Sequence, residues 1–131
     1  MTDSRFVQRV ANFLDKPLTP YDERLYSAVV HLSGLTGIAL PVIAYFAYRD
    51  RNAVIRRNAA EAANAQITVA IFWFTYGVVW TIPIFNLVFA IPLLLLTLPA
   101  VALTVGLPIF AALKALAGER FDYKIGLRVF S

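Results

Sequence analysis

The feature that most constrains this chain is a long stretch without charge. Glu61 and Lys114 bound residues 62–113, and no Asp, Glu, Lys or Arg lies between them. A soluble domain of 131 residues must expose much of its chain to water, so it cannot hide such a stretch. The hydrophobic fraction of 60% also exceeds the roughly 45–50% of ordinary soluble domains. The sequence therefore predicts an integral membrane protein with one membrane domain over residues 1–131.

The apolar residues divide into segments of spanning length. As a helix, residues 25–48 would rise roughly 36 Å, enough to cross a hydrocarbon core about 30 Å thick. The uncharged stretch has room for two more crossings, and we place its break between Pro83 and Asn86. The predicted fold is all-α, with transmembrane helices at residues 25–48, 67–84 and 88–115. Prolines should kink the first helix and bend or loosen the third, at Pro41 and at Pro92, Pro99 and Pro108.

The segment before the first span predicts a separate short helix. Its apolar side chains recur on one face, which is typical of an amphipathic helix within residues 1–17: Phe6, Val10, Phe13 and Leu14. We favour a place in the membrane interface, and contact with a partner subunit is the alternative. Thr19, Pro20 and Asp22 then predict the start of the next helix through a capping box.

Two further segments flank the membrane bundle predicted for residues 25–117. Residues 49–66 are rich in alanine and arginine, which favours a helix that continues into the second span. In the tail, residues 118–131, apolar and polar side chains alternate from Phe121 to Val129. This period indicates a strand or an extended segment at the membrane surface, and its apolar character predicts that it is docked.

Basic residues set the predicted orientation. The N-terminal segment carries four, offset by four acids, whereas the loop after the first span and the C-terminal side carry eight. The positive-inside rule then predicts a multi-pass protein of the inner (cytoplasmic) membrane, with the loop and the cytoplasmic tail inside and the N-terminus outside. The predicted basic membrane-surface residues are Arg49, Arg51, Arg56, Arg57, Lys114, Arg120, Lys124 and Arg128.

Three motifs carry a resemblance to a known family. They are HLSG at residues 31–34, EAANAQIT at residues 61–68 and KALAGERFDY at residues 114–123. With them, residues 25–130 resemble a widespread group of small bacterial membrane proteins that carry a domain of unknown function. That group is related to the twenty-kilodalton component of the chloroplast inner-envelope protein translocon. The resemblance implies the group's fold and, through the translocon, a pore-forming role.

The second of these motifs places polar groups at the mouth of a span. Glu61, Asn64 and Thr68 lie at i, i+3 and i+7 on one helical face, while Gln66 points elsewhere. Such groups are costly against lipid, so the stripe should face protein or a water-filled cavity. We favour helix packing over the entrance of an ion or peptide pathway. In the packing interpretation, Glu61 pairs with a basic residue of the preceding loop: Arg49, Arg56 or Arg57.

His31 is the only histidine, and it lies in the first predicted span. If residues 25–48 cross the membrane, His31 lies roughly 25 Å from the depth of Glu61. We therefore predict a neutral, hydrogen-bonded imidazole rather than a proton relay, with partners at its own depth: Trp80, Thr81 or Asn86. Its small neighbours predict close helix packing, either within the chain or between copies: Ser33, Gly34 and Gly37.

The residue types also limit the chemistry. With no cysteine and one histidine, the chain lacks thiol nucleophiles and a multi-histidine metal site of its own. No nucleophile elbow, phosphate-binding glycine loop or paired-carboxylate site is present, which predicts a non-enzyme without cofactor or metal. The net charge of +4 is attributed to membrane flanks rather than to nucleic-acid binding.

The predicted function is that of an accessory or assembly subunit of a larger membrane complex. Its expected partners are the lipid bilayer and other membrane subunits or copies of itself. An oligomeric pore or translocon-like channel element is the main alternative, although three spans enclose no channel alone. A protein that binds anionic lipid through its basic residues is the weaker alternative.

Overall fold

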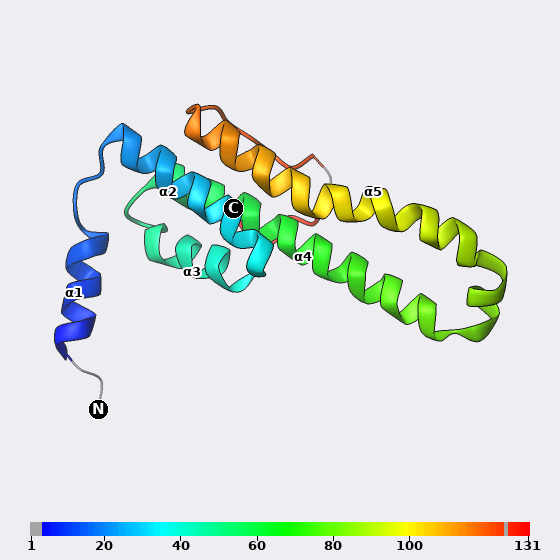
Figure 1. The fold of residues 1–131 in the computed structure, drawn as a ribbon. Coiled ribbons are helices and arrows are strands. Elements are labelled where there is room, and N and C mark those ends of the chain that lie inside the picture. The colour runs from blue at the N-terminus through cyan, green and yellow to red at the C-terminus, as the bar shows by residue number, and fades with distance from the viewer. Residues whose placement is uncertain (1–3, 125) are drawn as a thin grey trace.

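The computed structural model describes residues 4–124 and 126–131, and helices account for most of them (Figure 1). These described residues contain no strand. The start of the predicted amphipathic segment, residues 1–3, and Ile125 in the alternating tail lie outside them. The helices are α1 (Ser4–Leu14), α2 (Pro20–Ser33), α3 (Ala39–Tyr48), α4 (Ala53–Thr81) and α5 (Pro83–Leu116), with a 3-10 helix at Gly34–Thr36.

The longest helices, α4 and α5, form an antiparallel hairpin that extends well beyond the other elements (Figure 1). α4 ends at Thr81 and α5 begins at Pro83, whose missing N–H suits the first helical turn. The predicted break at this proline is confirmed, as is the helix that leads into the second span. α5 continues through its three internal prolines and curves along its length. Both helices are long and apolar enough to cross a membrane.

The first predicted span is wrong, because residues 25–48 fold back on themselves. α2 and α3 form a helical hairpin, joined by the 3-10 helix and Gly37. Gly37 has φ 125° and ψ −173°, a region of backbone space that is essentially reserved for glycine. Pro41 lies in the first turn of α3, where proline is tolerated, so it kinks no long helix. Among the described residues, two helices are able to span a membrane, not three.

Small side chains allow four helices to pack together at one end of the molecule. α2 contacts both α4 and α5, and α3 contacts α4. The buried side chains in these contacts are mostly alanines, which let helix backbones approach closely: Ala28, Ala59, Ala60, Ala62, Ala112 and Ala115. We call this end the head; it comprises α2, α3, residues 53–68 of α4, residues 108–116 of α5 and the tail.

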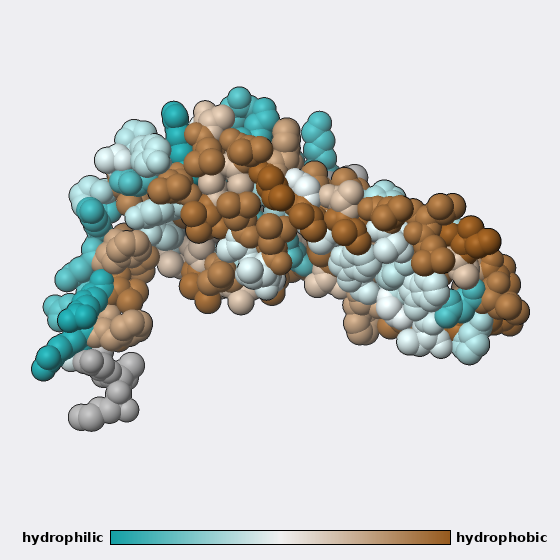
Figure 2. Space-filling model, in the orientation of Figure 1, coloured by the Kyte–Doolittle hydropathy of each residue, from teal (hydrophilic) through white to brown (hydrophobic). Residues whose placement is uncertain are grey.

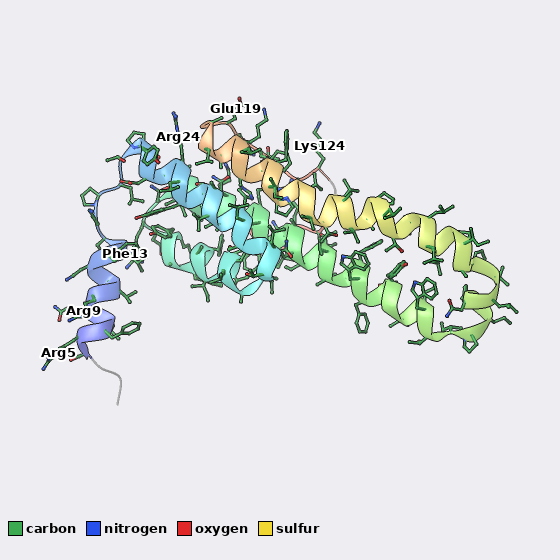
Figure 3. The ribbon with its side chains drawn as sticks, in the orientation of Figure 1. Arg5, Arg9, Phe13, Arg24, Glu119 and Lys124 are labelled. Carbon is green, nitrogen blue, oxygen red and sulfur yellow. The ribbon has the colours of Figure 1, made fainter. Side chains whose placement is uncertain are left out.

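The predicted capping box before α2 and the predicted amphipathic helix before it are confirmed. Thr19 caps α2 by accepting a hydrogen bond from the Asp22 N–H at 3.2 Å, and the Asp22 carboxylate accepts from the Thr19 N–H at 3.0 Å. α1 is amphipathic, and Arg5 and Arg9 project on the side away from the head (Figure 3). An ion pair of 2.8 Å between Arg51 and Asp15 holds the end of α1 near the head.

Candidate functional site

A buried polar cluster lies at the centre of the head. His31 of α2 has no exposed surface, and its Nε2 lies 3.0 Å from Asn58 Oδ1 on α4. The Asn58 amide nitrogen donates to Ser27 Oγ and to the carbonyl of Val54, so its oxygen is left to accept. The proton of the imidazole is therefore on Nε2. His31 Nδ1 then accepts from the hydroxyl of Tyr123, 3.3 Å away, in the tail.

This environment keeps His31 neutral. α2 lies outside the two spanning helices, and burial is the largest cause that lowers the pKa of its histidine. The bond to Asn58 and the charge of Glu61 act in the opposite direction and are smaller. Burial also raises the pKa of Tyr123, so this hydroxyl stays protonated and available as a donor. His31 therefore serves as a hydrogen-bonded link between α2, α4 and the tail.

Acidification should destabilise the fold through His31. Because burial lowers the pKa of the folded histidine, the unfolded chain binds more protons once the pH falls below the ordinary value of 6.5. We expect the free energy of unfolding to fall between pH 7 and pH 5 by at most about 1.4 kcal/mol per pH unit. Thermal unfolding in mild detergent should show this slope for the native chain and lose it for His31→Gln. An equal slope in both proteins would assign the effect to another group.

The predicted partners of His31 are wrong. Thr81 Oγ1 donates to the carbonyl of Val78 at 2.7 Å, and the Asn86 amide donates to the carbonyl of Trp80 at 2.8 Å. The three predicted partners, Trp80, Thr81 and Asn86, lie near the turn between α4 and α5, at the opposite end of the molecule from the head (Figure 1). The prediction failed because it matched depths along a first span that does not exist. The folded-back hairpin instead places His31 beside Asn58, one turn before Glu61 on α4.

The polar stripe of α4 binds the backbone of the tail. Asn64 Oδ1 accepts from the N–H groups of Val129 and Phe130, both at 2.8 Å, and its amide donates to the Phe130 carbonyl at 2.9 Å. Thr68 Oγ1 accepts from the Leu127 N–H at 3.0 Å. In a sheet, such backbone N–H and carbonyl groups would bond to a neighbouring strand. Here the side chains of Asn64 and Thr68 take that place. The predicted docking of the tail is confirmed, although by side chains rather than by a sheet.

Glu61 completes this contact with charge. It is buried, and its carboxylate accepts from the Tyr123 N–H at 3.0 Å and from the Arg128 guanidinium. Arg128 also donates to the Tyr123 carbonyl at 3.1 Å, which links the beginning and the end of the tail. The Tyr45 hydroxyl of α3 donates to the carbonyl of Ser131 at 2.9 Å. We call the set Glu61, Asn64 and Thr68, with the tail backbone that they bind, the tail clamp.

The predicted ion pair of Glu61 with the preceding loop is wrong. Its cation, Arg128, comes from the far end of the chain. The other predicted basic residues also lie at the head end of the molecule, where Lys124 projects outward (Figure 3). Three of them form further ion pairs, namely Arg51 with Asp15, Lys114 with Glu119 and Arg120 with Asp122. Arg49, Arg56 and Arg57 lie around the start of α4, and Arg56 donates to the Arg49 carbonyl.

The small residues near His31 serve the hairpin turn. A Cβ added at Gly34 would lie 3.0 Å from Gln66 Nε2, so glycine allows the 3-10 helix to approach α4 closely. Ser33 Oγ donates to the Val30 carbonyl at 2.7 Å. Gln66 is buried against this turn and, as the sequence predicted, lies off the face that binds the tail.

The sequence interpretation missed Asn58 and Tyr123. Asn58 precedes Glu61 by three residues, so the polar stripe could have been extended by one turn. Tyr123 had no comparable signal, because its partner is on α2, far away in sequence.

Beyond the head, α4 and α5 are joined by two polar links and separated by an apolar groove. Trp73 Nε1 donates to Thr104 Oγ1 at 3.1 Å, and the Tyr76 hydroxyl contacts Thr97 Oγ1. The groove holds about 290 Å³ and extends to the head, where Tyr123 forms part of its lining. Its lining is largely apolar, from Val69, Phe72, Leu96, Pro99, Leu103 and Leu107.

One known protein family matches the chain over both the head and the two long helices. The sequence profile of the MamF/MmsF family, described as the magnetosome magnetite crystal formation protein family, matches residues 22–130. The chain belongs to this family. The match overturns the expected membership in the group related to the chloroplast translocon. No curated protein and no solved structure matches the chain.

The MamF/MmsF match extends from the first turn of α2 through the tail, so it includes the α2–α3 hairpin, the tail clamp and both helices that are able to span a membrane. α1 lies outside it. The family is involved in magnetosome magnetite crystal formation, a membrane-associated process. Among the described residues, no three His, Cys, Asp or Glu side chains lie together as a metal site would require.

Proposed function

We propose that this MamF/MmsF chain is a non-enzymatic assembly subunit, which joins other membrane proteins or copies of itself during magnetosome magnetite crystal formation. The observation that carries the proposal is the apolar groove along the uncovered α4–α5 hairpin. In the most apolar 18-residue stretch of α5, 0% of the residues are buried within the protein, and in that of α4 the share is 28%. The groove between them is lined by apolar side chains and prolines that a third helix could pack against.

The distribution of charge favours assembly over direct contact with mineral. Iron sites in proteins use carboxylate, imidazole or thiolate ligands. The turn between the spans, residues 82–86, contains none of these groups. In the head, the buried carboxylate of Glu61 and the imidazole of His31 are already engaged by the tail and by α4. A role through protein partners fits these residues better than a role through iron ligation.

The hydrogen bonds made by polar side chains in α4 and α5 disfavour a pore. Two pairs of polar side chains within the spans bond across the hairpin, Trp73–Thr104 and Tyr76–Thr97, so these four groups are not left to line a water-filled path. The stripe that could have formed a pathway entrance is covered by the tail.

We also propose that both termini lie in the cytoplasm. Two crossings return the chain to the side on which it started. All 12 Lys and Arg residues lie at or before residue 57 or at or after residue 114, and the turn between the spans carries none. The positive-inside rule then places the head inside. The earlier prediction of an outside N-terminus required the third span.

Filling the groove should test the assembly role. Leu103→Trp places a large side chain in the groove, whereas Leu98→Trp makes the same change on the exposed outer surface of α5. We expect the native chain and Leu98→Trp to purify from the source membrane in a complex larger than one copy, and Leu103→Trp to purify mainly as a monomer. Native mass measurement in mild detergent separates these outcomes. A monomeric native chain without a stoichiometric partner would refute the proposal, and a closed homo-oligomer that conducts ions in liposomes would favour the pore.

A further inference from the structure

The outer surface of the α2–α3 hairpin is apolar. Seven large apolar side chains on it are 38–61% exposed: Val29, Leu32, Leu35, Ile38, Leu40, Ile43 and Phe46. Residues 25–48 contain no Asp, Glu, Lys or Arg, while Arg24 and Arg49 stand at the two ends of the hairpin. A surface of this size and composition is not expected in water.

From this surface we propose that the α2–α3 hairpin is a re-entrant membrane element, which enters the bilayer from the basic side, turns at Gly37 and leaves on the same side. Its partner is the acyl chains of that leaflet. α3 has 10 residues. Such a helix is about 15 Å long, which is half of a hydrocarbon core of about 30 Å. The hairpin is therefore too short to cross and long enough to reach into one leaflet.

Continuity with the spanning helices supports lipid as the partner. Gly34, near the tip of the hairpin, contacts Gln66, which lies within the uncharged part of α4. The tip therefore points along α4 toward the spans, and its apolar surface continues onto theirs. In the space-filling view, hydrophobic residues extend from the head to the far end of the α4–α5 hairpin (Figure 2).

Several polar groups near the tip of the hairpin are hydrogen-bonded within the protein. Ser33 and Thr36 donate their hydroxyl groups to the carbonyls three residues earlier, both at 2.7 Å. The Gly37 N–H donates to the Gly34 carbonyl at 3.1 Å. His31 faces inward, to Asn58 and Tyr123. Non-helical backbone at membrane depth is tolerated where its polar groups are bonded within the protein, and the Gly37 N–H meets this condition.

Single cysteines can measure the depth directly, because the native chain has none. Leu35→Cys lies near the tip and Ile43→Cys on α3, while Tyr21→Cys at the start of α2 is an exposed control outside the apolar surface. Each full-length variant is spin-labelled in liposomes at low protein density. Collisions with oxygen, which concentrates in the hydrocarbon, are compared with collisions with a water-soluble nickel complex. Native-like trypsin resistance of the tail confirms that each variant is folded.

We expect the oxygen-to-nickel collision ratio at positions 35 and 43 to exceed the ratio at position 21 several-fold. Frequent nickel collisions at positions 35 and 43 would show a hairpin in water and would overturn the proposal. Shielding from both reagents, or magnetic broadening between labels on two copies, would show a surface covered by protein and would also overturn it. The measurement does not depend on the assembly role, since it uses dilute protein without partners.

Discussion

Replacing Asn64 with alanine should release the tail from α4 and lower the free energy of unfolding by about 2–4 kcal/mol. One side chain makes all three bonds that hold Val129 and Phe130. Asn64 is only 4% exposed, so water cannot easily replace the lost amide at its own position. The variant should unfold at lower temperature in mild detergent. Trypsin should also cut after Arg128 much faster, because a released tail can enter the protease.

The matched control is Asn12→Ala, the same change at an exposed position of α1. It should leave both the melting temperature and the cleavage rate after Arg128 unchanged. If Asn64→Ala melts like the native chain and its tail stays resistant, the tail is held by other contacts and the clamp is not its main attachment. Faster cleavage without a change in melting would instead show that the tail docks but does not stabilise the head.

Gly37→Ala should destabilise the head by about 1–3 kcal/mol, through backbone strain alone. No atom lies within 4 Å of a Cβ built at this glycine, so steric overlap is not the cause. The cost arises because φ is 125°, which an L-residue with a side chain rarely adopts. Relief of this strain would require α2 and α3 to separate, and His31 would then move away from Asn58. We expect a lower melting temperature and faster tryptic cleavage after Arg49.

Gly77→Ala is the control for this substitution. Gly77 lies within α4, and a Cβ there would also meet nothing within 4 Å. Its helical backbone accepts alanine, so this variant should be as stable as the native chain or slightly more stable. Equal stability of both alanine variants would mean that the turn can adopt another conformation, and the re-entrant hairpin would lose its structural basis.

Much of the fold follows from local patterns. Thr19, Pro20 and Asp22 predicted the start of α2 correctly, because capping involves residues three apart in one turn. Pro83 marked the break between the spans, because a proline at that point suits a helix start and not a helix interior. The stripe at Glu61, Asn64 and Thr68 was predicted to face protein, and it does. Each of these predictions needed only spacing and residue type.

The errors about residues 25–48 and His31 share one origin. Hydropathy measures how apolar a segment is, and residues 25–48 are apolar throughout. The segment was therefore predicted to be one continuous helix. Hydropathy contains no information on φ at Gly37, which decides whether the chain continues or reverses. Once the first span was assumed, the depth of His31 and its partners followed wrongly, and the predicted side of the N-terminus also rested on that span. The resemblance to the translocon-related group rested on short motifs, and the match to the MamF/MmsF family over residues 22–130 replaced it.

By itself, the sequence determined the membrane class of this protein, its two long apolar helices, its amphipathic N-terminal helix and the concentration of basic residues at one end. These properties depend on composition and on spacing within single helices. Only the tertiary structure decided that α2 and α3 fold back, that His31 meets Asn58 and Tyr123, and that Arg128 pairs with Glu61. Those contacts join residues far apart along the chain, so they depend on how whole helices pack, which no local pattern records.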